Sequence, residues 1–151
     1  MFVSVDRAKA VEHAPGLFSA KLIDGSRGAE RLSLLHGWLK PGAQHALHTH
    51  ETEEVVYVIS GQGILEIDGR RFPVRAGDAM RFPPNVPHST LNTHPTDDLV
   101  FVAAFSDQII DARSCAAPTQ QGPRESRLAP IVNRARWLAR RIVRRMTAAS
   151  H

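Results

Sequence analysis

Two histidines and a nearby glutamate are the residues of this sequence whose types and spacing best suit chemistry. His48 and His50 are two positions apart, so both imidazoles point to the same face of an extended strand. Glu54 follows at even spacing, and a turn between them would return its carboxylate to that face. A third imidazole could come from His88, because the prolines of 84–87 fix the preceding loop. Imidazole and carboxylate ligands together suit divalent metals such as Fe, Mn, Ni, Co or Zn.

The elements that must position these residues are predicted to be short β-strands. Apolar runs of strand length, rich in Val, Ile and Phe, cover residues 32–39, 54–59, 63–67, 71–74, 79–82 and 99–105. Turn residues separate the runs, and Asp68-Gly69 is a strong hairpin signal, because both residues tolerate positive φ. Many closely spaced short strands indicate an all-β antiparallel barrel or sandwich. The absence of an internal repeat predicts one barrel.

Two spaced motifs in this region resemble those of the cupin superfamily. The first motif is matched by Gly42, His48, His50, Glu54 and Gly61, and the second by Gly77, Pro83, His88 and Asn92. Asn85 stands where the family has Gly, a mild departure because Asn tolerates the left-handed conformation best among the other residues. The resemblance covers residues 31–105.

The resemblance implies a conical barrel of two antiparallel sheets with one metal ion inside. The ion would be bound by His48, His50, Glu54 and His88. We expect Fe(II), with Mn, Ni, Co or Zn as alternatives. Four protein ligands leave about two positions of an octahedron open for a substrate and a second small molecule.

Strand alternation predicts which side chains line the cavity and which face outward. The predicted pocket comprises Trp38, Val56, Val58, Met80, Phe82, Phe101, Phe105 and Asn92. General acid–base chemistry would fall to Glu54, to a metal-bound water or to His36. His36 and Trp38 lie on the same face of their strand, and the sequence leaves open whether this face points into the barrel or outward. His45 lies at odd spacing from His48 and is predicted to be a loop or rim residue.

These features favour a metal-dependent enzyme acting on a small organic molecule. The leading hypothesis is an Fe(II)-type dioxygenase. A redox-neutral decarboxylase, isomerase or cyclase using the same site is the first alternative, and a non-catalytic small-molecule-binding or sensor protein is the second. Outward-facing Val55, Tyr57 and Ile59 need a cover, which predicts a homodimer.

Charge divides the chain into two unlike parts. Residues 1–113 carry a net charge of −3, whereas residues 114–151 contain 8 Arg against Glu125 alone, a net of +7. Residues 130–147 are predicted to form an amphipathic helix with an apolar face and an Arg face, joined by a linker over residues 114–129. This helix would dock on the barrel or bind an acidic partner. A basic tail on an acidic body does not predict nucleic-acid binding.

The remaining features concern domain limits and compartment. We expect residues 1–30 to pair with a barrel formed by residues 31–113. No apolar run approaches the length of a transmembrane helix, and the first residues do not resemble a signal peptide. Cys115 is the only cysteine, so no internal disulfide can form, and the cytoplasm is the expected location.

Overall fold

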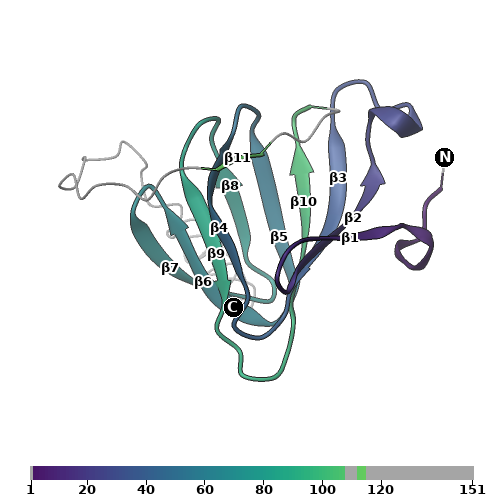
Figure 1. Ribbon diagram of the computed structural model, residues 1–151. Coiled ribbons are helices and arrows are strands. Elements are labelled where there is room, and N and C mark those ends of the chain that lie inside the picture. The colour runs from purple at the N-terminus through teal and green to yellow at the C-terminus, as the bar shows by residue number, and fades with distance from the viewer. Residues whose placement is uncertain (1, 108–111, 115–151) are drawn as a thin grey trace, which may run out of the picture. The chain divides into compact units, whose positions relative to one another are not determined.

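The chain forms two antiparallel sheets (Figure 1). The computed structural model describes residues 2–107 and 112–114. The strands are β1 (Ala10–Ala14), β2 (Leu17–Ile23), β3 (Ser33–Leu39), β4 (Gln44–His50), β5 (Glu54–Ser60), β6 (Gln62–Ile67), β7 (Arg70–Arg75), β8 (Ala79–Phe82), β9 (His88–Asn92), β10 (Leu99–Phe105) and β11 (Ala112–Ser114). Single 3-10 turns occur at Val5–Arg7 (η1) and Gly25–Arg27 (η2). The all-β class is therefore confirmed.

The first sheet has six strands in the order β1-β2-β3-β10-β5-β8, and the second has five in the order β11-β4-β9-β6-β7. The hairpin of β1 and β2 joins the first sheet through β2, which pairs with β3. Apart from Ser114, which ends β11, the predicted linker and C-terminal helix lie outside the described residues. No helix in the described part of the chain is long and apolar enough to cross a membrane.

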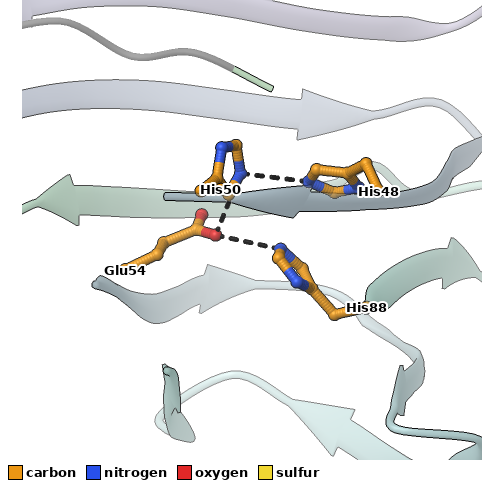
Figure 2. A group of neighbouring side chains, drawn as sticks. All are labelled: His48, His50, Glu54 and His88. Atoms are coloured by element: carbon orange, nitrogen blue, oxygen red, sulfur yellow. Dashed lines mark hydrogen bonds and ion pairs between the residues drawn. The ribbon is translucent and has the colours of Figure 1, made fainter. Parts of the chain in front are cut away.

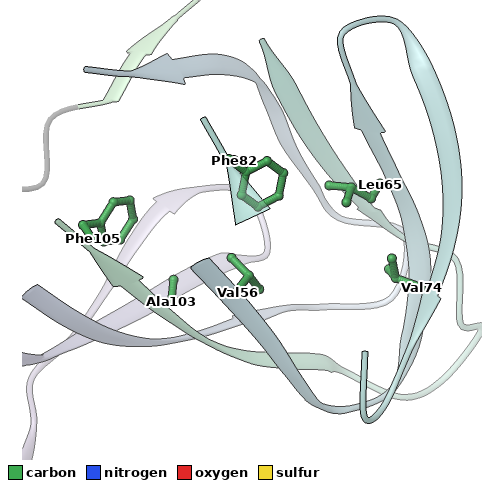
Figure 3. Packing of buried hydrophobic residues seen from close by; sticks show 6 residues of the cluster. All are labelled: Val56, Leu65, Val74, Phe82, Ala103 and Phe105. Atoms are coloured by element: carbon green, nitrogen blue, oxygen red, sulfur yellow. The ribbon is translucent and has the colours of Figure 1, made fainter. Parts of the chain in front are cut away.

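The hydrophobic core joins the two sheets (Figure 3). Its main cluster combines side chains from β5, β8 and β10 of the first sheet with side chains from β6 and β7 of the second. The buried members are Val56, Leu65, Val74, Phe82, Ala103 and Phe105. Full burial of one large apolar side chain contributes about 1.5–3 kcal/mol. This shared core fixes the spacing between the sheets, and so the spacing between site residues on different strands.

Two local features show how the sequence specifies these strands. Asp68 and Gly69 have φ values of 48° and 74°, so the predicted tight turn between β6 and β7 is present. Gly37 on β3 lies opposite Phe101 on β10, and a Cβ at Gly37 would lie 2.5 Å from the Phe101 ring. Only glycine leaves room there for an aromatic ring to cross the strand.

Candidate metal centre

Four buried side chains from three strands meet at one point between the sheets (Figure 2). His48 and His50 come from β4, while Glu54 begins β5 and His88 begins β9. One nitrogen or oxygen atom of each residue lies within 4.8 Å of the corresponding atom of every other. All four residues are at most 7% exposed. The sequence motifs predicted this group of four, and the fold brings them together.

Backbone carbonyl groups orient two of the imidazole rings. His48 Nδ1 donates a hydrogen bond to the Ala46 carbonyl at 2.7 Å, and His88 Nδ1 donates one to the Val86 carbonyl at 2.8 Å. A carbonyl oxygen can only accept, so in each ring the proton of the neutral form lies on Nδ1. Nε2 of both rings is then an unprotonated donor of an electron pair, which is the form that binds a metal ion.

These unprotonated nitrogens face other polar atoms of the cluster at short range. His48 Nε2 lies 3.1 Å from His50 Nε2, and His88 Nε2 lies 3.2 Å from a carboxylate oxygen of Glu54. His50 Nε2 is 3.5 Å from the same oxygen. With His88 neutral, two electron pairs face each other across a buried gap, an arrangement that is costly without a cation. The donor set and its convergence therefore fit a divalent metal ion.

Burial also keeps histidines of this region neutral. It lowers the pKa of His48 to about 3, with smaller contributions in the same direction from the rings of His45 and His88. Burial likewise lowers the pKa of His45 to about 4. Both rings are uncharged near neutral pH, so no proton has to leave His48 before it can bind a metal ion.

The loop before β9 fixes His88 against the strand that carries the other histidines. Asn85 adopts a left-handed conformation with φ of 62°, as expected for the residue at the family's glycine position. Its backbone N–H donates a 2.7 Å hydrogen bond to the carbonyl of His50. The Phe82 ring stacks on His88 with centroids 4.2 Å apart. Loop, strand and aromatic ring together hold the imidazole in place.

A largely apolar cavity adjoins three of the four predicted ligands, His48, Glu54 and His88. Its other lining residues are Leu39, His45, Val56, Val58, Val74, Met80, Phe82, Thr90, Leu99 and Phe101. Five of these, Val56, Val58, Met80, Phe82 and Phe101, are predicted pocket residues. The cavity volume is about 30 Å³, enough for about two waters. The cavity therefore suits a small molecule.

The structure places His36 and Trp38 away from this cavity. Both line a separate depression with Ala20, Val100 and residues of the N-terminal segment, on the opposite face of β3 from Leu39. Alternation along β3 puts positions 36 and 38 on one face and 37 and 39 on the other. The expectation that His36 performs acid–base chemistry at the metal, and that Trp38 lines its pocket, is therefore corrected.

Asn92 and Phe105 were also predicted to line the pocket, and the structure places neither of them in its wall. The Asn92 amide group donates to the carbonyls of Leu39 and Asp97, and its oxygen accepts from the N–H of His94. Its polar atoms thus join the end of β9 to the end of β3 and to the loop before β10. Phe105 belongs to the main core, where its ring lies edge-on to His50 at 5.0 Å. Phe105 therefore packs against His50, one of the predicted metal ligands, and is not among the residues that line the cavity.

His45 is the site residue that the sequence reasoning missed. It lines the cavity, and its ring stacks on His48 with centroids 3.8 Å apart. In the pairing of β4 with β9, His45 lies opposite Thr90 and His48 opposite His88, so three steps on β4 match two on β9. Such a bulge reverses the alternation of side chains. No local sequence signal reveals it; only the paired strand does.

Comparison with known proteins agrees with this architecture. Residues 38–105 match the family model for the cupin domain. A polyketide cyclase from Streptomyces resistomycificus superimposes with a TM-score of 0.67 at 27% identity, over 79% of this chain and 87% of that chain. An RmlC-like cupin from Shewanella frigidimarina gives a TM-score of 0.61 at 26% identity, over 70% of this chain and 88% of that chain. Residues 38–105 therefore form a cupin domain, and the fold is that of the cupin superfamily.

A curated relative shares the same region. An oxalate-binding protein from Thermotoga maritima is 39% identical over 68 residues, which is 44% of this chain and 55% of that protein. The match thus spans about half the length of that relative. The family match and the four converging side chains together define a cupin domain with a candidate metal centre.

Proposed function

We propose that the protein is a metal-dependent enzyme that acts on a small organic acid. The observation that carries the proposal is the convergence of three imidazoles and one carboxylate at the wall of a largely apolar cavity. Among the described residues that line this cavity there is no Lys or Arg. A bound divalent ion would supply the positive charge and the open coordination positions that an acidic substrate needs.

Apolar side chains next to the cluster would form most of the wall around a bound substrate. Val56, Val58 and Met80 form apolar wall on β5 and β8, and Phe101 adds wall from β10. These side chains exclude water, and a low local dielectric strengthens charge interactions inside the site. The small cavity restricts the acid to a few carbon atoms. Glu54 is the described carboxylate within reach of a substrate proton, so we assign acid–base work to it.

Redox-neutral chemistry is the reaction type we favour over dioxygenation. Of the three similar proteins named above, two have functional names, an oxalate-binding protein and a polyketide cyclase, and neither name denotes a reaction with dioxygen. The Fe(II) dioxygenase hypothesis rests on the ligand set alone, because four protein ligands leave room for two further molecules. Non-catalytic binding of a small acid is the third possibility, and it uses the same site.

Metal analysis combined with turnover assays tests this proposal. The full chain is purified without added metal, and the expected content is about one divalent ion per chain. A panel of two- to four-carbon acids is then followed by oxygen uptake, CO₂ release and substrate loss. Substrate loss without oxygen uptake supports redox-neutral chemistry, and substrate-dependent oxygen uptake supports the dioxygenase. Protein that neither contains a divalent ion nor binds added Mn, Fe, Co, Ni or Zn would refute the proposal.

A further inference from the structure

We infer that His45 and Thr90 form a second polar contact in the metal cavity and select acids that carry a second polar group. This inference rests on the proposed function, because it concerns the acid that the metal would bind. It assigns a binding role to two residues outside the metal-ligand set. The remainder of the cavity wall beyond the ligands is apolar.

The bulge in β4 is the structural device that creates this contact. His45 is three residues before His48, and regular alternation would turn its ring to the opposite face. The irregular register between His45 and His48 removes this difference, so both rings reach the cavity. Bulges are frequent beside active sites, where they redirect a side chain. The bulge contains Ala46, whose carbonyl also accepts the hydrogen bond from His48 Nδ1.

The polar atoms of His45 and Thr90 are available for a ligand. Thr90 is the register partner of His45 on β9, so their side chains project from neighbouring strands on the same side of the sheet. Among the described residues, neither side chain has a hydrogen-bond partner, in contrast to His48 and His88. A neutral imidazole offers one N–H and one acceptor nitrogen, and the threonine hydroxyl offers both functions. Together they can bind an oxygen-rich group.

The position of this pair defines the class of substrate. The His45 ring stacks on the ring of His48, with the two centroids 3.8 Å apart. His45 therefore contacts the metal-binding cluster through one of the predicted ligands. An acid bound through one carboxylate at the metal would therefore place a group two or three bonds away near His45 and Thr90. A short dicarboxylate, hydroxy acid or keto acid has such a group, whereas a simple monocarboxylate has only a methyl or methylene there.

The test compares two small acids on the Co²⁺-loaded full chain by calorimetric titration. Acetate carries only the metal-binding carboxylate, and malonate adds a second carboxylate. The wild-type protein should bind malonate more tightly than acetate. His45→Leu and Thr90→Val should each weaken malonate binding roughly tenfold, the effect of one lost hydrogen bond to a charged group, and change acetate binding less than about twofold. Thr90→Ser keeps the hydroxyl and should retain the malonate preference.

Two controls separate the binding role from a structural one. Gln44→Leu alters the exposed residue next to His45 on the same strand and should change neither affinity. Cobalt content, measured on every variant, should stay at the wild-type level. Equal losses for both acids, or an unchanged malonate preference in His45→Leu and Thr90→Val, would overturn the inference while leaving the proposed function intact. Wild-type protein that holds cobalt and binds neither acid would refute both.

Discussion

Asn92 and the metal-binding cluster are both buried and polar, but they differ in how their polar atoms are paired. Asn92 is 1% exposed, and its amide atoms make three hydrogen bonds to the backbone. The cluster of His48, His50, Glu54 and His88 is buried to a similar degree, but within it Nε2 of neutral His88 and a carboxylate oxygen of Glu54, both donors of an electron pair, lie 3.2 Å apart. A buried group whose bonds are all made within the chain supports the fold. A group left with facing acceptors fits an external cation.

The largest expected effect concerns the three imidazoles. Replacing His48, His50 or His88 by Ala should weaken metal binding at least about 100-fold, since losing even a residue that only supports a ligand costs 10–100-fold. The apoprotein should stay folded in these variants, because all six buried side chains of the main core are kept; the loss of the ring contact between His50 and Phe105, or between His88 and Phe82, should lower the denaturation midpoint only modestly. Metal content and urea denaturation measure the two effects. Full metal occupancy in any of these variants would remove that residue from the ligand set.

The converse change is Asn92→Ala. It leaves the carbonyls of Leu39 and Asp97 without their donor, so we expect a loss of about 2–3 kcal/mol in the free energy of unfolding. The folded fraction should bind the metal ion with unchanged affinity, because Asn92 is not part of the cluster. Urea denaturation of the metal-free variant gives the stability, and titration with Co²⁺ gives the affinity. A variant of wild-type stability that had lost the metal would reverse the roles assigned to the two groups.

Metal binding should stabilise the protein through the histidine cluster alone. An ion present at 100 times its dissociation constant adds about 2.7 kcal/mol to the free energy of unfolding. We expect this gain, seen as a rise in melting temperature, in the wild type and in Asn92→Ala. In His50→Ala the gain should fall to about 0.4 kcal/mol or less. An equal rise in all three proteins would mean that the ion binds elsewhere.

A smaller effect is expected for Glu54→Gln. The variant keeps one carbonyl oxygen as a ligand but loses the negative charge, so metal affinity should fall less than in any of the three His→Ala variants. Competition with a chelator of known affinity would rank the four variants. An affinity for Glu54→Gln below those of the histidine variants would show that charge, more than the imidazole set, holds the ion.

The smallest effect on the monomer's stability is expected at the outer face of β5. Val55, Tyr57 and Ile59 are 46%, 51% and 47% exposed, whereas Val56 and Val58 between them are buried. We predict that the exposed residues form the contact between two copies of the chain. Tyr57→Lys should shift the protein from dimer to monomer in sedimentation, with little change in the affinity for metal. A wild-type monomer at micromolar concentration would contradict this prediction.

The sequence predicted the four candidate metal ligands better than it predicted which other side chains face the cavity. The spacing of His48, His50 and Glu54 and the proline-rich loop before His88 are local features, so the motifs identified the four residues directly. The cavity role of His45 depends on a bulge that exists only in the pairing of β4 with β9.

The inward-facing side of a strand was harder to predict where the strand carries no metal-ligand motif. On β3 nothing in the sequence fixed the inner face, and His36 and Trp38 lie on the outer one. The hairpin of β1 and β2 also escaped the strand assignment, because four of the five β1 residues are exposed and carry no clear apolar alternation. Register and bulges arise from contacts between distant segments, which the spacing of residues within one segment does not encode.

Crystallography of the full chain with Co²⁺, using anomalous scattering at the cobalt edge, tests the central claim most directly. The account predicts one strong anomalous peak per chain, about 2.0–2.2 Å from Nε2 of His48, His50 and His88 and from a carboxylate oxygen of Glu54. Asn92 should keep its three backbone hydrogen bonds in the same crystal. An anomalous map without a peak between these four side chains, or with the ion bound at another place, would contradict the account.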